Sequence, residues 1–353
     1  MLFSTSSGAR IAINGFGRIG RAFFKLAQEK GSLDVVAIND LGDIETLTYL
    51  LRYDSVYGRY KKPVSIKNDP PTGGGKRYLV FDGKEVLFLQ EKEPTRLPWA
   101  ELKIDVVVES TGAFESYEKA RVHVQAGAKR VVLTAPAKDE DAPDAKTVLM
   151  GINEEALKTC VLSSNGSCTT NSASPVMQIL SEKLGVKKAF LNTVHGYTAT
   201  QSLIDGPTKG SDVRRGRAAA VNIVPSTTGA TIAVERAIEA VKGKFDGMSM
   251  RVPTITGSLS AITFMANKST TAEEINNIFK EAEKEKRWQG IFKTTSDPVV
   301  STDIIGDPCA AIIDLSLTKV VDGDLCAVFS WYDNEFGYTN TLVNHVMKVA
   351  EYL

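Results

Sequence analysis

A chain of 353 residues is too long for one compact core, so the sequence predicts two domains. Lysine plus arginine and aspartate plus glutamate both number 42, and this zero net charge argues against nucleic acid as a primary partner. No apolar stretch approaches the roughly 20 residues needed to cross a bilayer, and the N-terminal segment has no apolar signal core. We therefore expect no membrane partner and a cytoplasmic location.

The cysteines and histidines form no metal-binding motif. The four cysteines are Cys160, Cys168, Cys309 and Cys326, and no two of them have C-x-x-C spacing. The chain has only three histidines. We expect no bound metal, no disulfide framework and four free thiols, most of them in the core.

In the first half of the chain, short apolar runs alternate with helical segments of about ten residues. The predicted strands span 10–14, 35–39, 106–109 and 130–133, and the predicted helices span 18–29, 44–51 and 117–126. A hairpin is expected over 78–89 around Asp82-Gly83, and a loop over 68–76. This alternation is typical of βαβ units and predicts an α/β fold with a doubly wound parallel sheet of the Rossmann type.

The second half has longer strand-like runs with fewer helices. The predicted strands span 189–194, 248–252, 259–265, 310–317 and 325–332, and the predicted helices span 231–241, 272–286 and 338–353. Thr271 and Glu274 have the spacing of a capping box at the start of the second helix. This order predicts an α+β domain with a mainly antiparallel sheet.

The segment that follows the first strand has the spacing of a dinucleotide-binding turn. Gly15, Gly17 and Gly20 form G-x-G-x-x-G between a strand and a helix, and Asp40 ends the next strand twenty residues later. The helix N-terminus would bind a pyrophosphate, and the Asp40 carboxylate would bind the adenosine ribose and repel a 2′-phosphate. NAD is therefore the expected cofactor. The alternative is a glycine-rich turn with Asp40 as a helix cap.

A second candidate site lies in the polar stretch LSSNGSCTTNSASP at 162–175. Ser167 is a predicted N-cap, which places Cys168 in the first turn of a helix, where backbone N–H groups favour a thiolate. Pro175 lies beyond that turn and is expected to kink the helix. The alternative is a buried structural thiol.

His195 is the candidate base for this thiol. It follows the apolar run AFLNTV, so it lies at the end of a predicted strand. A cysteine with a histidine nearby in space is a known pairing of nucleophile and base. The alternative is a hydrogen-bonded histidine at the surface.

Six motifs in order along the chain resemble the phosphorylating glyceraldehyde-3-phosphate dehydrogenase family. They are NGFGRIGR, SCTTN, HGYTATQ, RRGRAAAVNIVPSTTGA, MRVPT and WYDNEFGY. The resemblance implies an NAD-binding domain over 1–167, a catalytic domain over 168–333, and a C-terminal helix over 334–353 that returns to the first domain. It also implies a homotetramer acting in glycolysis.

The resemblance further implies roles for individual residues. Cys168 would be the nucleophile and His195 the base in the oxidation of D-glyceraldehyde 3-phosphate to 1,3-bisphosphoglycerate, through a hemithioacetal and a thioester. The implied cofactor-binding residues are Gly15, Gly17, Arg18, Ile19, Gly20, Asp40, Thr111, Thr134, Asn334 and Tyr338. The implied residues for the substrate phosphate and inorganic phosphate are Ser167, Thr169, Thr198, Arg214, Thr228, Gly229 and Arg251.

The chain departs from the family pattern at two positions beside the cysteine. Ser172 stands where a second cysteine is frequent, and Gly166 where alanine is usual, which we expect to loosen the backbone. Three alternatives stay open: erythrose-4-phosphate dehydrogenase, an NADP-preferring biosynthetic form, and a non-catalytic RNA-binding or scaffold role. The arginines at 214, 215 and 217 could also be a solvated charged loop.

Overall fold

The computed structural model describes residues 8–70, 75–208 and 212–353. Within this range the chain forms two compact units. Unit 1 contains the described residues up to Val148, together with Glu154–Asn165 and Leu342–Leu353. Unit 2 contains Leu149–Asn153 and Gly166–Thr341. Residues 71–74 of the predicted loop lie outside the described residues.

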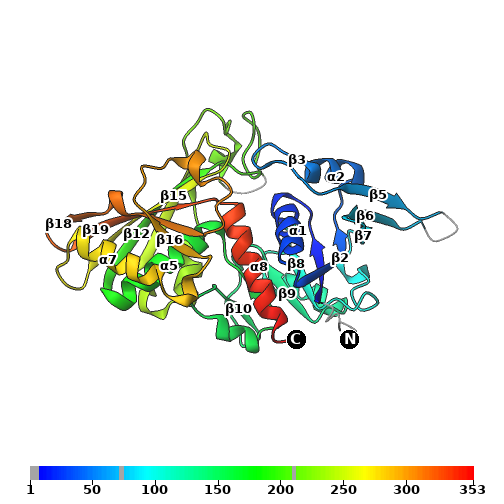
Figure 1. The fold of residues 1–353 in the computed structure, drawn as a ribbon, viewed down its shortest axis with the longest axis horizontal. Coiled ribbons are helices and arrows are strands. Elements are labelled where there is room, and N and C mark those ends of the chain that lie inside the picture. The colour runs from blue at the N-terminus through cyan, green and yellow to red at the C-terminus, as the bar shows by residue number, and fades with distance from the viewer. Residues whose placement is uncertain (1–7, 71–74, 209–211) are drawn as a thin grey trace, which may run out of the picture. The chain divides into compact units, whose positions relative to one another are not determined.

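Unit 1 is built on a nine-stranded sheet in the order β10-β11-β9-β8-β1-β2-β7-β6-β5 (Figure 1). Its strands are β1 (Ala9–Asn14), β2 (Leu33–Asn39), β5 (Val64–Asn68), β6 (Arg77–Phe81), β7 (Lys84–Leu89), β8 (Val106–Glu109), β9 (Arg130–Leu133), β10 (Ala145–Thr147) and β11 (Leu162–Ser164). All pairs from β10 to β7 are parallel, and only the β7-β6-β5 edge is antiparallel. The predicted Rossmann-type sheet and the hairpin at Asp82-Gly83 are confirmed.

The helices of unit 1 follow the predicted pattern with one exception. They are α1 (Arg18–Lys30), α2 (Ile44–Arg52), α3 (Tyr117–Ala120) and α4 (Val122–Gln125). The prediction of one helix over 117–126 is wrong, because the chain tightens at Arg121, whose carbonyl accepts from the Val124 N–H three residues ahead. A two-stranded ribbon, β3 (Tyr53–Asp54) with β4 (Gly58–Arg59), follows α2.

Unit 2 is built on an eight-stranded sheet in the order β13-β14-β12-β15-β19-β17-β16, with β18 beside β19. The strands are β12 (Val186–Gly196), β13 (Val224–Thr227), β14 (Phe245–Val252), β15 (Ser258–Ala266), β16 (Phe292–Thr295), β17 (Ala311–Asp314), β18 (Lys319–Val321) and β19 (Leu325–Tyr332). Only β12 with β14 and β16 with β17 pair in parallel, so the predicted mainly antiparallel sheet is confirmed.

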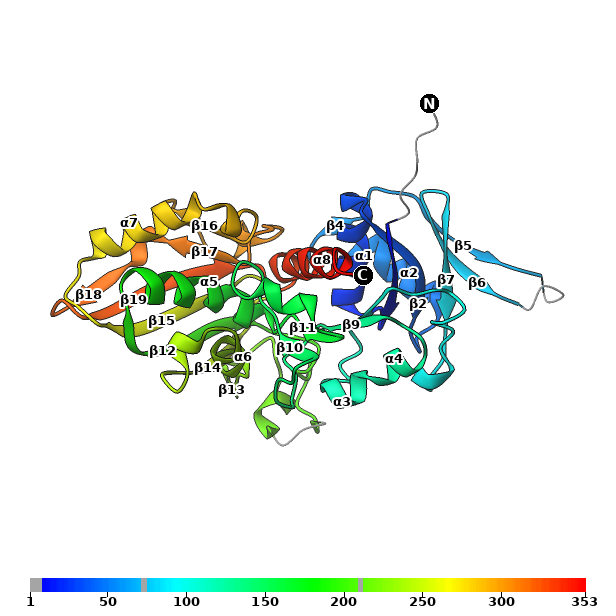
Figure 2. The ribbon, with the colours of Figure 1, turned by 90° about the horizontal axis from the view of Figure 1, so that it is seen from below.

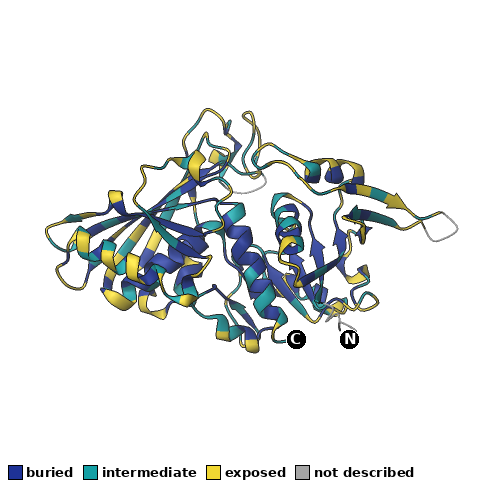
Figure 3. Cartoon of the chain, viewed as in Figure 1, coloured by how far each residue is buried: buried dark blue, intermediate teal, exposed yellow. Residues whose placement is uncertain are grey.

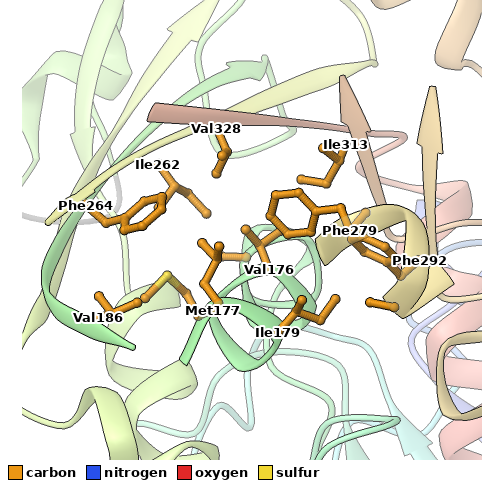
Figure 4. Packing of buried hydrophobic residues seen from close by; sticks show 14 of the residues in the cluster. Val176, Met177, Ile179, Val186, Ile262, Phe264, Phe279, Phe292, Ile313 and Val328 are labelled. Atoms are coloured by element: carbon orange, nitrogen blue, oxygen red, sulfur yellow. The ribbon is translucent and has the colours of Figure 1, made fainter. Parts of the chain in front are cut away.

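The helices of unit 2 cover one face of this sheet (Figure 2). They are α5 (Cys168–Lys183), α6 (Ala230–Ala237) and α7 (Ala272–Glu283), and α8 (Phe336–Ala350) starts in unit 2. Val176 and Met177 of α5 pack against Ile262 of β15 and Val328 of β19 in a single apolar cluster (Figure 4). Figure 3 shows the resulting pattern, in which the central strands of both sheets carry many buried residues and the outer helix faces are exposed. None of the helices in the described part of the chain is long and apolar enough to span a membrane.

Several predicted boundaries in unit 2 are wrong. The predicted strand 310–317 ends at Asp314, whose carboxylate accepts from the Ser316 N–H and so starts a 3₁₀ turn. The helix predicted over 231–241 ends at Ala237, and the helix predicted over 272–286 ends at Glu283. Thr271 does cap α7, but the Glu274 carboxylate accepts from Thr270 Oγ1, so no reciprocal bond to Thr271 is present among the described contacts.

Candidate active site

Helix α5 presents Cys168 at its first position. Ser167 Oγ accepts from the Thr170 N–H at 3.1 Å and the Ser167 N–H donates to Thr170 Oγ1 at 3.0 Å, which together form a capping box. Gly166 precedes the cap with φ of +63°, and a Cβ there would lie 2.8 Å from Thr170 Cγ2. Gly166 therefore fits this turn, because a residue with a Cβ would be strained there. Helix α5 also continues through Pro175 to Lys183.

Strand register brings His195 beside Arg251. The two residues are direct partners in the parallel pair β12–β14, one residue before the end of each strand. His195 Nε2 lies 3.2 Å from Cys168 Sγ, and Arg251 Nη1 lies 2.7 Å from His195 Nδ1. The predicted cysteine, base and phosphate-binding arginine are thus one contiguous group, although 83 positions separate Cys168 from Arg251.

The Nδ1 atom of His195 faces two groups that make opposite demands. The Gly196 carbonyl oxygen lies 2.6 Å away and needs a proton on Nδ1, whereas the Arg251 guanidinium needs a lone pair there. A proton on Nδ1 leaves Nε2 free to take a proton from the reaction at Cys168. The base-competent tautomer is therefore the one that donates to Gly196.

Burial dominates the electrostatics of this pair. Burial, followed by the charge of Arg251, lowers the pKa of His195 to about 3, so the imidazole is neutral at pH 7. Burial raises the pKa of the Cys168 thiol, although the charge of Arg251 and a hydrogen bond from Thr169 lower it. The backbone groups at the helix start lower the pKa, in the direction expected, but desolvation outweighs them.

Residues that the sequence did not indicate as functional pack beside the cysteine–histidine pair. The Tyr332 hydroxyl lies 3.0 Å from Thr169 Oγ1 and 2.7 Å from Thr193 Oγ1, and its ring meets the His195 ring edge-on at 5.9 Å. Burial raises the pKa of Tyr332. The alternation of buried residues along β19 could have indicated that Tyr332 faces the core. Ser172 is buried within 3.2 Å of two other serine hydroxyls.

Ser167, Thr169 and Arg251 belong to the group around Cys168, and the other four predicted phosphate residues lie in three further places. Thr198 follows β12 by two residues, and Thr228 and Gly229 lie at the start of α6, where nothing occupies the space beside Gly229. Arg214 is exposed in the turn Val213–Gly216, and its backbone N–H donates to Asp212. Its neighbour Arg215, which we did not select, is the arginine of this run whose charge lowers the pKa of His195.

In unit 1 the glycine-rich turn has the geometry of a nucleotide cradle. Gly15 has φ of +95°, and a Cβ on Gly20 would lie 2.1 Å from the Gly15 carbonyl oxygen. A Cβ on Gly17 would meet no atom within 4 Å. Arg18 and Ile19 follow as the first residues of α1, which has no side-chain cap. An open space at an uncapped helix N-terminus fits a pyrophosphate.

Asp40 links this turn to the end of β2. Its Oδ2 accepts from the Phe16 N–H at 2.6 Å and its Oδ1 accepts from the Gly42 N–H at 2.8 Å. Asp43, and not Asp40, is the N-cap of α2. The alternative of Asp40 as a helix cap is therefore wrong.

The remaining predicted cofactor residues are divided between the units. In unit 1, Thr111 donates through both its N–H and its hydroxyl to Glu109, and the Thr134 N–H donates to the Glu109 carbonyl oxygen. In unit 2, Asn334 Oδ1 accepts from Thr256, Gly257 and Ser258, and its Nδ2 takes part in none of these bonds. The buried Tyr338 hydroxyl donates to the Gly166 carbonyl oxygen, just before the cysteine.

A nucleotide cradle in one unit and a cysteine–histidine pair in the other define a class of protein, the NAD-dependent aldehyde dehydrogenases that use a cysteine. The described residues contain no group of three or more histidine, cysteine or carboxylate side chains placed to hold a metal ion. Unit 2 thus holds a thiol, a neutral imidazole and an arginine, and unit 1 holds a dinucleotide turn.

Comparison with known proteins is more specific. Residues 9–117 match the family model "Glyceraldehyde 3-phosphate dehydrogenase, NAD binding domain", and residues 167–334 match the corresponding C-terminal domain. The chain is 48% identical to a glyceraldehyde-3-phosphate dehydrogenase of Thermotoga maritima, over 95% of this chain and 97% of that protein. It is 43% identical to one from Streptomyces coelicolor, over 98% and 99% respectively. The chain belongs to the glyceraldehyde-3-phosphate dehydrogenase family.

Proposed function

We propose that this chain catalyses the NAD-dependent, phosphorylating oxidation of D-glyceraldehyde 3-phosphate to 1,3-bisphosphoglycerate, as an enzyme of glycolysis. The observation that carries the proposal is the contact between Cys168 Sγ and His195 Nε2 at 3.2 Å, with Arg251 on the other side of the imidazole. A thiol, a base and a fixed cation in one group suit an aldehyde that carries a phosphate.

The side chains act in sequence on the aldehyde. Cys168 Sγ attacks the carbonyl carbon, and its proton passes through His195 Nε2 to the aldehyde oxygen, which gives a hemithioacetal. His195 Nε2 then takes the hydroxyl proton as the carbon is oxidised to a thioester. NAD, when bound, accepts the hydride. Inorganic phosphate attacks the thioester carbon, and the thiolate of Cys168 leaves.

The chain's own groups also hold the two phosphates. Arg251 and Thr198 would hold the substrate phosphate, and Ser167, Thr169, Thr228, Gly229 and Arg214 the attacking one. We also propose Arg215 for the attacking phosphate, because its charge acts on His195 while Arg214 is exposed. We expect Arg215→Ala to raise the KM for inorganic phosphate more than Arg214→Ala does. A larger effect of Arg214→Ala would return that role to Arg214.

The two units suggest a division of labour. We propose that residues 1–167 with 334–353 hold NAD, with Thr111, Thr134, Asn334 and Tyr338 around the cofactor, and that 168–333 perform the chemistry. NAD should be preferred over NADP, because the Asp40 carboxylate lies beside the glycine-rich turn. A cytoplasmic location follows from the family resemblance.

We also propose a homotetramer. Five apolar side chains between residues 203 and 223 are each at least 69% exposed: Leu203, Ile204, Val213, Val221 and Ile223. On β12, Phe190 and Val194 are also exposed on the face opposite the core. Exposed apolar surface of this kind favours association with further copies of the chain. Sedimentation velocity tests this, since a monomer at micromolar concentration would contradict it.

Single-turnover kinetics tests the chemistry. With D-glyceraldehyde 3-phosphate, NAD and no inorganic phosphate, we expect one equivalent of NADH for each Cys168 and then arrest, because the thioester has no acceptor. Addition of phosphate should start steady turnover. Steady NADH formation without phosphate would contradict the phosphorylating mechanism, and no NADH under either condition would contradict the assignment.

A further inference from the structure

A row of buried polar side chains lies directly behind the cofactor turns of unit 1. Asn39, Asn14 and Glu109 are the last residues of β2, β1 and β8, and strand register places Asn14 opposite both of the others. Each is at most 5% exposed. One residue earlier, the same strands carry Ile38, Ile13 and Val108, all fully buried and apolar. The sheet therefore changes from apolar to polar at its carboxyl edge.

Hydrogen bonds connect this row from strand to strand. Asn39 Nδ2 donates to Asn14 Oδ1 at 2.8 Å, and Asn14 Nδ2 donates to Glu109 Oε2 at 2.6 Å. The Asn39 side chain also donates through Nδ2 to the Glu91 carbonyl oxygen and accepts through Oδ1 from the Glu91 N–H. We call Asn39, Asn14 and Glu109 the polar row. The Glu109 carboxylate also accepts from the Thr111 N–H at 2.8 Å.

Two further buried side chains fix the far side of Glu109. Trp99 Nε1 donates to His123 Nδ1 at 3.2 Å, and His123 Nε2 lies 2.9 Å from Glu109 Oε2. An indole N–H can only donate, so Nδ1 accepts and Nε2 is the nitrogen that carries a proton. His123 is thus set to donate to Glu109, and the carboxylate is fully hydrogen-bonded on this side.

Every member of the polar row is followed by a turn of the predicted cofactor site. Asn14 precedes Gly15, Asn39 precedes Asp40, and Glu109 precedes Ser110 and Thr111. Glu109 Oε1 accepts from both the N–H and the hydroxyl of Thr111, at 2.8 and 2.5 Å. Ser110 Oγ donates to the Gly15 carbonyl oxygen at 2.6 Å. The carboxylate therefore holds two of the turns against each other.

We propose that Glu109 is a positioning residue for the dinucleotide: through Asn14 and Thr111 it sets the turns at Gly15 and Thr111 in their binding geometry before NAD arrives. Burial of a carboxylate costs free energy. One position earlier, the same three strands pack with apolar residues alone, so packing of the sheet does not require a carboxylate. Preorganised turns reduce the ordering cost of binding. The proposal rests on the proposed function only in taking NAD as the ligand.

Glu109→Gln should weaken NAD binding without affecting the thiol chemistry of unit 2. The amide replaces one acceptor oxygen with a donor, so it opposes the donors of Asn14 and His123. By calorimetry we expect the Kd for NAD to rise about tenfold or more. Alkylation of Cys168 in the NAD-free protein should keep its wild-type rate. Glu101→Gln, at an exposed position of the same unit, is the matched control and should keep the wild-type Kd.

An exchange of the two partners separates positioning from general stabilisation. In the double variant Asn14→Asp with Glu109→Gln, the amide can donate to the new carboxylate and its oxygen can still accept from Thr111. We expect the Kd to return to within about threefold of wild type. The His123 N–H still opposes the amide in this variant. Adding Trp99→Phe frees His123 to change tautomer, so this third change should improve NAD binding.

These measurements test the role of Glu109 in NAD binding independently of the proposed function. A folded Glu109→Gln protein with wild-type NAD affinity would overturn it. So would a loss of affinity that the exchanged pair does not recover, because a merely structural role predicts that two buried changes are worse than one. If Glu109→Gln does not fold, the exchanged pair alone decides, and a Kd more than about tenfold above wild type overturns the proposal. Failure of the wild type to oxidise D-glyceraldehyde 3-phosphate while it still binds NAD would overturn only the proposed function.

Discussion

The cofactor turns of unit 1 and the cysteine–histidine pair of unit 2 are built by different means. In unit 1 the glycines lie within six consecutive residues, and the buried polar row behind them holds the backbone in place. In unit 2 strand register sets His195 of β12 beside Arg251 of β14, and α5 brings Cys168 to the imidazole. Binding thus depends on backbone shape, whereas chemistry depends on a few side chains, so substitutions should separate the two functions.

The largest expected effect removes the chemistry and keeps the binding. Cys168→Ser should lower kcat by at least about 10³-fold, because an alcohol beside a neutral imidazole is a far weaker nucleophile than a thiolate. The Kd for NAD should not change, since the glycine turn and Asp40 belong to unit 1. Steady-state kinetics and calorimetry measure the two quantities. Parallel losses in both would contradict the separation.

The next effect concerns Arg251, which contacts His195 and is proposed to hold the substrate phosphate. Arg251→Gln should raise the KM for the aldehyde by about 10- to 100-fold, as expected when a charged hydrogen bond to phosphate is lost. The pKa of His195 should rise from about 3, because the charge of Arg251 helps to lower it. NMR of labelled histidine measures the pKa. Arg287→Gln, which removes a cation paired with Glu182, is the control and should leave both values unchanged.

A third experiment concerns the two buried histidines whose pKa is lowered, one in each unit, and tests the one in unit 1. His345 in unit 1 and His195 in unit 2 both have a pKa lowered to about 3, mainly by burial. The unfolded chain binds these protons below pH about 6.5, whereas the folded chain does not. Each histidine should therefore cost about 1.4 kcal/mol of stability for each pH unit as pH falls from 6.5 toward 3, with full stability above 6.5.

Denaturant unfolding at pH 6.5 and pH 5 measures this slope. His345→Gln replaces the titrating ring beside Ser163 with a neutral amide, so its stability should depend less on pH across that window. Equal pH dependence in the variant and the wild type would show that His345 is not the acid-sensitive group.

The smallest effect concerns cofactor preference. Asp40→Ala should shift the ratio of NAD to NADP affinities by about tenfold toward NADP, because a carboxylate that repels a 2′-phosphate is removed. NAD affinity should also fall, since the Asp40 carboxylate holds the Phe16 N–H. Asp43→Ala removes the neighbouring helix cap and should leave the ratio unchanged. A wild type that uses NADP as well as NAD would contradict the charge argument.

Local sequence predicted the binding half of the molecule better than the catalytic half. The strand, turn and helix around Gly15 are contiguous, so their order alone indicated a nucleotide cradle. The N-cap at Ser167 was equally local, and it placed Cys168 correctly at the start of α5. In both cases neighbouring residues determine the backbone conformation.

The sequence alone could not predict contacts between strands that lie far apart along the chain. The register that sets His195 beside Arg251 depends on how β12 and β14 pair, and the support from Tyr332 depends on which face of β19 is buried. Burial is also a property of the whole fold, which is why the pKa of Cys168 is raised and not lowered. Sequence indicated which residues matter, while the fold determines which of them touch.

The most direct test of the central claim is the site of alkylation by iodoacetamide, read by peptide mass spectrometry. Cys168 is partly exposed at a helix start beside His195, whereas Cys160, Cys309 and Cys326 are buried. Burial raises the pKa of all four thiols, so its partial exposure and its contact with His195 Nε2, and not its pKa, distinguish Cys168. We expect one equivalent of label, on Cys168, to abolish activity, and His195→Asn to slow labelling and turnover together. An inactivating label on any other cysteine would contradict the assignment of Cys168 as the nucleophile.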